Sequence, residues 1–317
     1  MKSFLKGTLL FLLALTAATA YAQPVRIAGS GANVGAISLM SAEFRKQFPA
    51  TQFAPIEAVG STGSIKAVLA GAMHIALTAR PLTDAERAAG AREIEYARTP
   101  FAIVVRHDSR IESITRTQIA TYFSGAVDSG PDGVRVRPVL RPVTDVDNIL
   151  LKRMSVGAGP AIEQALKRPG MMVAATDREA ADLIERTTGA IGATTLGLIL
   201  AESRKLRALP LDGSAPTLAA LESGSYPYYK RLFVVVADKL PANAEAQRFV
   251  DYITSAPGKT LLRRTGHLLP PLLRGIDGFA TRSQATSVGC HTGSGHNWSF
   301  ASCAILLPGI SQRALGQ

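Results

Sequence analysis

The chain has 317 residues, enough for about two domains of ordinary size with a well-buried core. Hydrophobic residues make up 47% and charged residues 19%, which excludes an intrinsically disordered protein. The formal net charge is +11 at pH 7, and the two cysteines are too few for a disulfide-dense scaffold or a multi-cysteine zinc protein.

The first 22 residues are typical of a secretory signal peptide. Lys2 and Lys6 precede the apolar run Leu9–Leu15, and Ala20-Tyr21-Ala22 has the A-x-A pattern of a cleavage site. A short membrane anchor is the alternative interpretation, but the apolar run is too short to span a bilayer. We therefore expect cleavage after Ala22 and an exported mature protein.

Short apolar runs alternate with helical patterns from residue 23 to about residue 207, which predicts an α/β fold with a mostly parallel sheet. The first predicted strand is Val25–Ala28, and a helix with an apolar face from Val34 to Phe48 follows it. The next strand ends at Val59, where a second turn of small residues opens another helix. Further strands are predicted at 75–77, 102–105, 134–139, 171–173 and 191–193.

Three helix starts carry a capping signature, in which a threonine is followed three residues later by Glu or Gln. These pairs are Thr83 with Glu86, Thr115 with Gln118, and Thr176 with Glu179. Each pair predicts that a helix begins directly after its threonine.

The last predicted elements indicate how the domains are connected. A strand at 232–236 and a helix at 244–254 find no clear partners in the second α/β unit, which begins after the strand at 102–105. We therefore predict two α/β lobes joined by two crossing strands. The first lobe comprises residues 23–104 and 229–275, the second comprises residues 105–228, and a poorly ordered tail covers residues 276–317.

The basic residues do not indicate a nucleic-acid surface. They are scattered along the chain, and the densest clusters are pairs such as Arg263-Arg264. We expect no nucleic acid as a partner. A general preference for anionic solutes or surfaces and a merely solvated surface both stay open.

Two turns rich in glycine and hydroxyl residues follow the first two predicted strands. Gly29–Gly35 and Gly60–Lys66 each lie at the start of a helix, where free N–H groups and the helix dipole attract anions. The first turn is one residue too long for a dinucleotide-binding motif, and the second lacks the Gly-Lys-Ser/Thr of a Walker A loop. Because α/β proteins bind ligands at the carboxyl ends of their strands, we expect a small-anion site there. Plain structural turns are the alternative.

The usual catalytic and zinc-binding motifs do not occur in the sequence. It has no G-x-S-x-G nucleophile elbow and no H-E-x-x-H motif. In the tail, Cys290, His291, His296 and Cys303 allow three interpretations: a metal site, a Cys290–Cys303 disulfide or an unordered segment. We predict a protein that is not an enzyme and that has no cofactor and no metal site.

Six stretches of the sequence share their motifs with one known family. They are Gly29–Ala32, Gly60–Val68, Leu77–Asp84, Gln118–Gly125, Gly189–Gly192 and Ala244–Pro270. Together they resemble the phosphate-binding family of periplasmic solute-binding proteins, over most of residues 25 to 275. The resemblance implies a periplasmic-binding-protein fold of type II, whose two lobes close on phosphate or a related oxyanion. It also implies a periplasmic location and delivery of the ligand to a membrane-embedded ABC permease, and we expect the protein to be a monomer.

The resemblance further implies a set of ligand-binding residues. In the first lobe, the family's N–H and hydroxyl donors fall on the two glycine-rich turns and on the segment after Leu77. In the second lobe, Arg141 corresponds to the family's arginine, a bidentate partner of the oxyanion. The implied site residues are Ala32, Asn33, Ser61, Thr62, Thr78, Arg80, Arg141 and Asp145.

The chain departs from the family's pattern at two places. Ala79 replaces the aspartate that accepts the proton of a protonated phosphate, and alanine has no side-chain acceptor. The family's Ser-Gly-Thr turn after the arginine is replaced by a segment with Asp145 and Asp147, which would repel an anion in the cleft. Alternatively, both acids cap the helix through Met154 and do not face the cleft. Weak selectivity for phosphate over sulfate is expected, unless Asp145 supplies the missing acceptor.

Two other functions stay open. A binding fold with altered or lost anion specificity would serve as a sensor or an adhesion module, and the changes at Ala79 and Asp145 allow this. An exported hydrolase of phosphate esters is the second alternative, although the sequence shows no nucleophile–base pair and no metal cluster.

Overall fold

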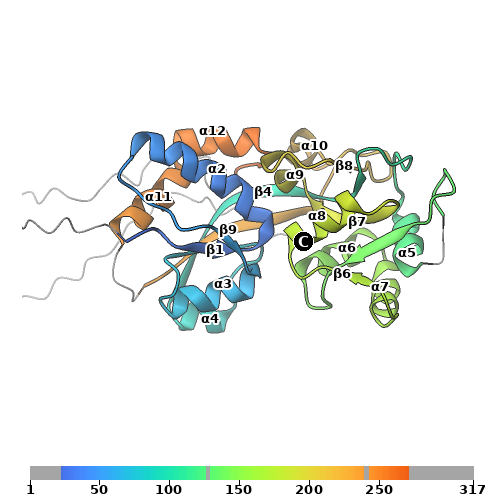
Figure 1. Ribbon diagram of the computed structural model, residues 1–317, viewed down its shortest axis with the longest axis horizontal. Helices are drawn as coiled ribbons and strands as arrows, with labels where there is room; N and C mark the ends of the chain where they lie inside the picture. Colours follow the sequence, from blue (N-terminus) through green and yellow to red (C-terminus); the bar gives the residue numbers. More distant parts are fainter. Residues whose placement is uncertain (1–22, 126–128, 239–242, 271–317) are drawn as a thin grey trace, which may run out of the picture. The chain divides into compact units, whose positions relative to one another are not determined.

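The computed structural model describes residues 23–125, 129–238 and 243–270, and Figure 1 shows their helices and strands coloured along the chain. The predicted signal peptide and the predicted tail, with Cys290 and Cys303, lie outside the described residues. None of the helices in the described ranges is long and apolar enough to cross a membrane.

A mixed sheet has the strand order β2-β1-β3-β9-β4-β7-β5-β6, with β8 paired to β4. The parallel strands β1, β2 and β3 form one end, and the parallel strands β5, β6 and β7 form the other. The strands are β1 (Ile27–Gly29), β2 (Glu57–Ala58), β3 (Ile75–Thr78), β4 (Ala91–Arg106), β5 (Arg137–Leu140), β6 (Met172–Val173), β7 (Ala190–Thr195), β8 (Leu206–Ala208) and β9 (Tyr229–Ala237).

The long strands β4 and β9 are antiparallel neighbours that connect the two ends of the sheet (Figure 1). β9 pairs with β3 and with residues 91–100 of β4, whereas residues 101–105 of β4 pair with β7. The sequence predicted only 102–105 of β4, because charged residues interrupt the apolar pattern before it. In the structure one of these charges, Glu95, forms an ion pair with Arg231 of β9, so the ladder continues through the charged stretch.

Helices cover both faces of each end of the sheet. We call lobe 1 the elements packed around β1 to β3 and lobe 2 those packed around β5 to β8, with β4 and β9 shared. In lobe 1, α2, α11 and α12 lie on one side of the strands and α3 and α4 on the other (Figure 1). The helices of lobe 1 are α2 (Gly31–Gln47), α3 (Gly60–Leu69), α4 (Asp84–Ala88), α11 (Ala244–Thr254) and α12 (Ala256–Arg264). Those of lobe 2 are α5 (Arg116–Ser124), α6 (Val146–Met154), α7 (Ala158–Leu166), α8 (Asp177–Arg186), α9 (Leu196–Ala201) and α10 (Leu218–Ser223).

The hydrophobic core is divided in the same way. In lobe 1, Phe44 of α2 packs edge to face on Phe249 of α11, with ring centroids 5.3 Å apart. The helices that follow β9 therefore cover the same strands as the first helix of the chain. The lobe 2 clusters draw on residues 101–228, including Phe101 and Phe123. The predicted lobe boundaries at 104/105 and 228/229 stay a prediction.

The capping signatures place the helix starts correctly. Complete capping boxes form at Thr83 with Glu86 and at Thr115 with Gln118, which confirms both predictions. At Thr176 the hydroxyl accepts the N–H of Glu179 at 3.1 Å, but the Glu179 carboxylate accepts the N–H of Ala175 instead.

Candidate functional site

A cavity of about 300 Å³ lies between lobe 1 and lobe 2, next to the carboxyl ends of β1, β3 and β5. Lobe 1 lines it with the start of α3 and the segment after β3, and lobe 2 with the starts of α6 and α8. Of the predicted site residues, the cavity brings together Ser61, Thr62, Arg80, Arg141 and Asp145.

The other three predicted site residues, Ala32, Asn33 and Thr78, are buried and do not line this cavity. Asn33 Oδ1 accepts a hydrogen bond from the Tyr96 hydroxyl at 2.7 Å. The Thr78 hydroxyl donates to the carbonyl of Arg80 at 2.8 Å. These polar groups therefore hold the loops beneath the cavity.

Helix α3 begins at the cavity without a side-chain cap. Its N-cap residue is Val59, which has no polar side-chain atom to accept the first N–H groups. Gly60 has a φ of 76°, a conformation that other residues rarely adopt, and it turns the chain from β2 into the helix. Ser61 Oγ accepts the N–H of Ala79 at 3.0 Å and keeps its own O–H to donate. The start of α3 therefore offers backbone and hydroxyl donors to an anion.

Arg80 lies beside this helix start, but an acid already pairs with it. Its Nη1 and Nη2 contact the Glu86 carboxylate at 2.8 and 2.7 Å, and Nη2 also donates to the Thr62 hydroxyl at 3.2 Å. The hydrogen bond from Arg80 lowers the pKa of Glu86 to about 2, so both partners stay charged. Arg80 therefore orients Thr62 and adds little net positive charge to the cavity.

Arg141 follows β5 and is the cation of the lobe 2 face. It is 6% exposed, and its Nη1 donates to the carbonyl of Ala174 at 3.1 Å. Its Nη2 contacts Asp145 at 2.7 Å and lies 4.0 Å from Asp177. Burial alone would lower the pKa of Arg141, but the surrounding aspartates raise it, so the guanidinium stays charged.

Asp145 both caps α6 and lines the cavity. One carboxylate oxygen accepts the N–H of Asp147 at 2.9 Å, and the other accepts a hydrogen bond from Arg141. Asn148 fixes the turn before the helix by donating to the carbonyls of Arg141 and Pro142 at 3.1 and 2.7 Å. The two interpretations of Asp145 from the sequence, a helix cap and a cleft residue, thus describe the same side chain.

A buried charge cluster lies behind Arg141. Lys230 of β9 forms ion pairs with Asp147 of α6 and Asp177 of α8, and all three residues are buried. Burial raises the pKa of Asp147 to about 7, although the charge of Lys230 acts in the opposite direction. Burial would also raise the pKa of Asp177, but Lys230 and Arg141 hold it below its ordinary value.

Asp177 also reaches across to lobe 1. Its Oδ2 accepts a hydrogen bond from the hydroxyl of Ser30, the N-cap residue of α2, at 2.9 Å. Gly31 permits this approach, because a Cβ there would lie 2.9 Å from the backbone nitrogen of Arg178. The Asp177 carboxylate thus lies at the start of α2, where the sequence predicted an external anion.

The sequence predictions did not include Ser30, Asp177 or Lys230. Asp177 directly follows the capping Thr176, where an acidic residue is an ordinary helix-start feature. Lys230 gave a signal, because it lies with Arg231 just before the apolar run Leu232–Val236, and a lysine buried in such a strand requires a paired acid. That signal indicates a partner but does not identify it.

The charges around the cavity favour an anion that carries a proton. The cationic side chains are Arg80, Arg141 and Lys230, and the acidic ones are Glu86, Asp145, Asp147 and Asp177. A protonated oxyanion can donate a hydrogen bond to a carboxylate in the wall, whereas a fully ionised one has no proton to donate and is repelled. Lobe 1 therefore supplies hydrogen-bond donors to an oxyanion, and lobe 2 supplies a cation together with hydrogen-bond acceptors.

No cluster of three or more His, Cys, Asp or Glu side chains that would hold a metal ion occurs in the part of the chain that the structure describes. The tail cysteines and histidines considered for such a site lie outside that part.

Comparison with known proteins agrees with this architecture. The family model described as PBP superfamily domain matches residues 15–257, and the chain belongs to that superfamily. The chain has the mixed α/β, two-lobed periplasmic-binding-protein fold, which confirms the predicted fold class.

Individual relatives share the fold at low sequence identity. The chain is 24% identical over 223 residues to the phosphate-binding protein PstS of Borreliella burgdorferi, which covers 67% of this chain and 78% of that protein. A putative phosphate ABC transporter substrate-binding protein with bound phosphate, from Clostridium perfringens, matches with a TM-score of 0.66 and 18% identity over 78% of this chain and 100% of its own. The periplasmic molybdate-binding protein of Azotobacter vinelandii matches with a TM-score of 0.56 and 11% identity over 78% of this chain and 99% of its own.

Proposed function

We propose that this protein is an exported solute-binding protein that captures phosphate or a related protonated oxyanion between its two lobes and delivers it to an ABC importer. The resemblance to phosphate-binding proteins in sequence and fold supports this proposal. In this account lobe 1 comprises residues 23–104 and 229–275 and lobe 2 comprises residues 105–228. The protein acts in the periplasm as a monomer, its partner is a membrane-embedded permease, and it catalyses no reaction.

One observation carries the proposal: the uncapped start of α3 faces the buried guanidinium of Arg141 across the cavity. A tetrahedral oxyanion between them can accept hydrogen bonds from the N–H groups of α3, from the Ser61 hydroxyl and from Arg141. A proton on the anion can be donated to Asp145, which supplies from lobe 2 the acceptor that Ala79 lacks.

A second candidate function rests on Asp145 and Asp177. These carboxylates already contact Arg141 and the start of α2, so they occupy positions that an oxyanion would take. A protein that no longer binds an anion, and serves as a sensor or adhesion module, would tolerate this arrangement.

A thermal-shift panel with phosphate, sulfate, molybdate and small organic acids distinguishes the two. A ligand at a hundred times its dissociation constant stabilises the folded protein by about 2.7 kcal/mol, so phosphate should raise the unfolding temperature measurably. Arg141→Ala should weaken phosphate binding about a hundredfold, because it removes a buried charge from the ligand's side. Arg153→Ala, which removes an exposed arginine of α6, is the matched control and should bind as the unmodified protein does. Absence of a shift with every anion would favour the second function.

A further inference from the structure

A second concave site lies in lobe 2, at the amino ends of β5 and β6. It is a groove of about 410 Å³, larger than the cavity between the lobes. Its walls come from the end of α5, from the start of β5 and from the segment that joins α7 to β6. Because the candidate ligand cavity is at the carboxyl end of β5, the length of that strand separates the two sites.

Three arginines line this groove: Arg135, Arg137 and Arg168. Arg137 is held in place by donating to the carbonyl of Thr188 at 2.8 Å. The Arg168 guanidinium lies against Gly125, where a Cβ would leave it no room. Two chain segments, the start of β5 and the segment after α7, thus bring these guanidinium groups to one groove.

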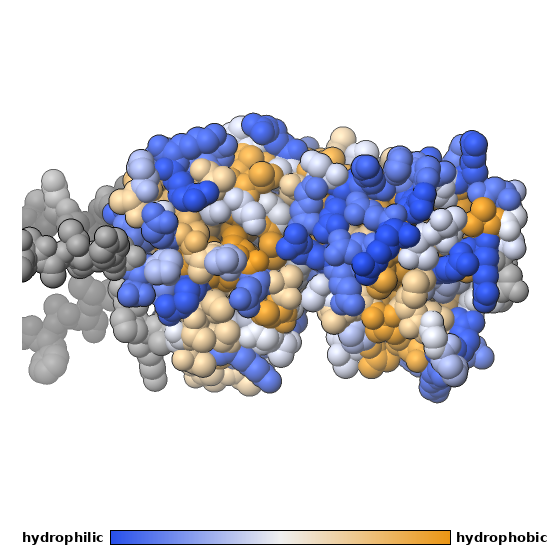
Figure 2. Space-filling model, viewed as in Figure 1, coloured by the Kyte–Doolittle hydropathy of each residue, from blue (hydrophilic) through white to orange (hydrophobic). Residues whose placement is uncertain are grey.

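These three arginines form no ion pair with an acid in the described ranges, whereas several other arginines of lobe 2, such as Arg106 and Arg116, do. Arg204, for example, pairs with Asp182, Glu185 and Glu202. Figure 2 shows a strongly hydrophilic surface over α8, the helix that contributes two of these acids. The groove therefore holds positive charge that the described protein leaves unneutralised.

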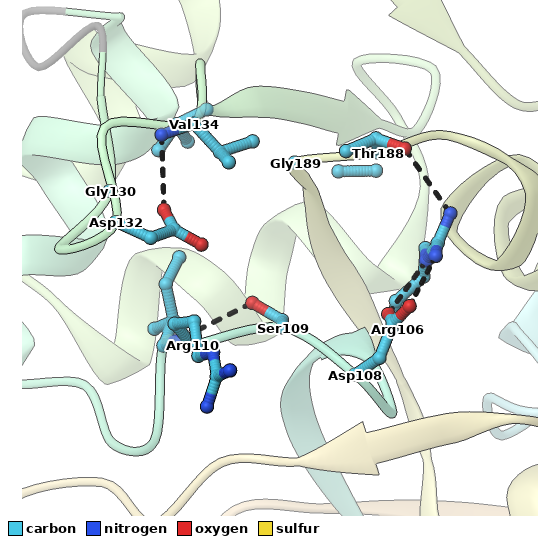
Figure 3. A pocket seen from close by; sticks show the side chains of 12 residues that line it. Arg106, Asp108, Ser109, Arg110, Gly130, Asp132, Val134, Thr188 and Gly189 are labelled. Atoms are coloured by element: carbon cyan, nitrogen blue, oxygen red, sulfur yellow. Dashed lines mark hydrogen bonds and ion pairs between the residues drawn. The ribbon is translucent and has the colours of Figure 1, made fainter.

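A neighbouring hollow in lobe 2 has a different charge composition. It has a volume of about 200 Å³ and shares only Val136 with the groove (Figure 3). There Arg106 pairs with Asp108, and the hollow is also lined by Arg110 and by a second acid, Asp132, which accepts the N–H of Val134 at 3.0 Å. Two acids and two arginines thus line the hollow, whereas the described lining of the groove holds three arginines and no acid.

We propose that the groove of Arg135, Arg137 and Arg168 is a second anion-binding site, for ligands that carry two or more phosphate groups. Guanidinium groups bind phosphate through paired N–H donors, and three of them repel one another until a polyanion neutralises them. With about 410 Å³, the groove is larger than the cavity between the lobes and has room for more than one phosphate group. Either a soluble oligophosphate or the phosphate-rich surface of a lipid bilayer supplies this chemistry.

The test compares the mature protein with the triple variant Arg135→Gln, Arg137→Gln, Arg168→Gln. The control variant, Arg45→Gln, Arg263→Gln, Arg264→Gln, removes the same charge from exposed arginines of lobe 1. Tripolyphosphate binding is measured by calorimetry and vesicle binding by co-sedimentation with bilayers that contain phosphatidylglycerol. Circular dichroism and the unfolding midpoint verify that each variant is folded. Arg135→Gln alone serves as a milder second variant, because the Arg135 guanidinium donates no hydrogen bond to another described residue.

The affinity of the triple groove variant for tripolyphosphate, for the vesicles or for both should be at least tenfold lower than that of the unmodified protein. Arg135→Gln alone should lower the same affinity several-fold. The control variant should bind with an affinity close to that of the unmodified protein. Loss for tripolyphosphate identifies a soluble ligand, and loss for vesicles alone identifies a bilayer. Failure of the unmodified protein to bind either probe, or equal losses in the groove and control variants, would overturn the proposal. The readout is independent of the cavity between the lobes, so failure of phosphate binding there leaves this test intact.

Discussion

The lobe 1 face and the lobe 2 face of the cavity between the lobes offer an anion different groups. The lobe 1 face is the start of α3, where small residues and hydroxyls leave backbone N–H groups uncapped. The lobe 2 face places Arg141 among carboxylates, and one of them, Asp145, caps α6 itself. A helix start without a side-chain cap attracts any anion. An arginine surrounded by carboxylates accepts only a ligand that can also donate a hydrogen bond to those carboxylates. In the proposed function, lobe 1 therefore provides affinity for anions and lobe 2 provides the selection among them.

The largest effect is expected from removing the cation that stabilises the lobe 2 face. Lys230→Met leaves Asp147 and Asp177 buried without their shared partner, which should lower the free energy of unfolding by about 3–5 kcal/mol. Chemical denaturation measures this loss. Lys167→Met, at an exposed lysine of lobe 2, is the control. If Lys230→Met lowers the free energy of unfolding as little as the control does, the cluster is not buried as described.

The same cluster should make stability depend on pH. The pKa of Asp147 is about 7 in the folded protein and 3.8 in an ordinary carboxyl, so the folded state holds this proton over a range in which the unfolded state has lost it. The stability from this group is complete below the lower value and is lost as pH rises through about 7, a change of about 4 kcal/mol. Asp147→Asn should remove this slope when denaturation midpoints are compared between pH 4 and pH 8. An identical slope in the variant and the unmodified protein would contradict the assignment.

A smaller effect is expected from the acid in the wall of the cavity. Asp145→Asn keeps a side chain that caps α6 but replaces a carboxylate with an amide that can also donate. Sulfate should then bind about tenfold more tightly, a change of about 1.4 kcal/mol, because repulsion is removed and a donor is added. Calorimetry with sulfate measures this, and Asp132→Asn, at an exposed loop acid outside the cavity, is the control. Unchanged sulfate affinity would mean that Asp145 acts only as a helix cap.

Local patterns predicted much of the architecture. The capping pairs at Thr83 and Thr115 placed two helix starts because a cap depends only on residues three positions apart. Arg141 and Ser61, which the family resemblance implied as site residues, line the cavity, and each follows a strand whose carboxyl end lies at that edge.

The remainder of the site depends on contacts between distant segments. Gly31 and Gly35 suggested an anion-binding turn, but a Cβ at Gly35 would meet Glu202, so this glycine serves the packing of α2 against lobe 2. Asp177 and Lys230 are 53 positions apart and meet only because β9 returns to the sheet beside β4. A pattern along the chain carries no information about such a pair until the topology is known.

Calorimetric titration of the mature protein with phosphate and, separately, with sulfate at pH 7 tests the central claim most directly. Phosphate retains a proton at this pH and sulfate does not, while both are tetrahedral. Because Asp145 and Asp177 offer acceptors beside Arg141, phosphate should bind at least about tenfold more tightly than sulfate. Equal affinities, or tighter binding of sulfate, would contradict the claim that the lobe 2 face selects a protonated oxyanion.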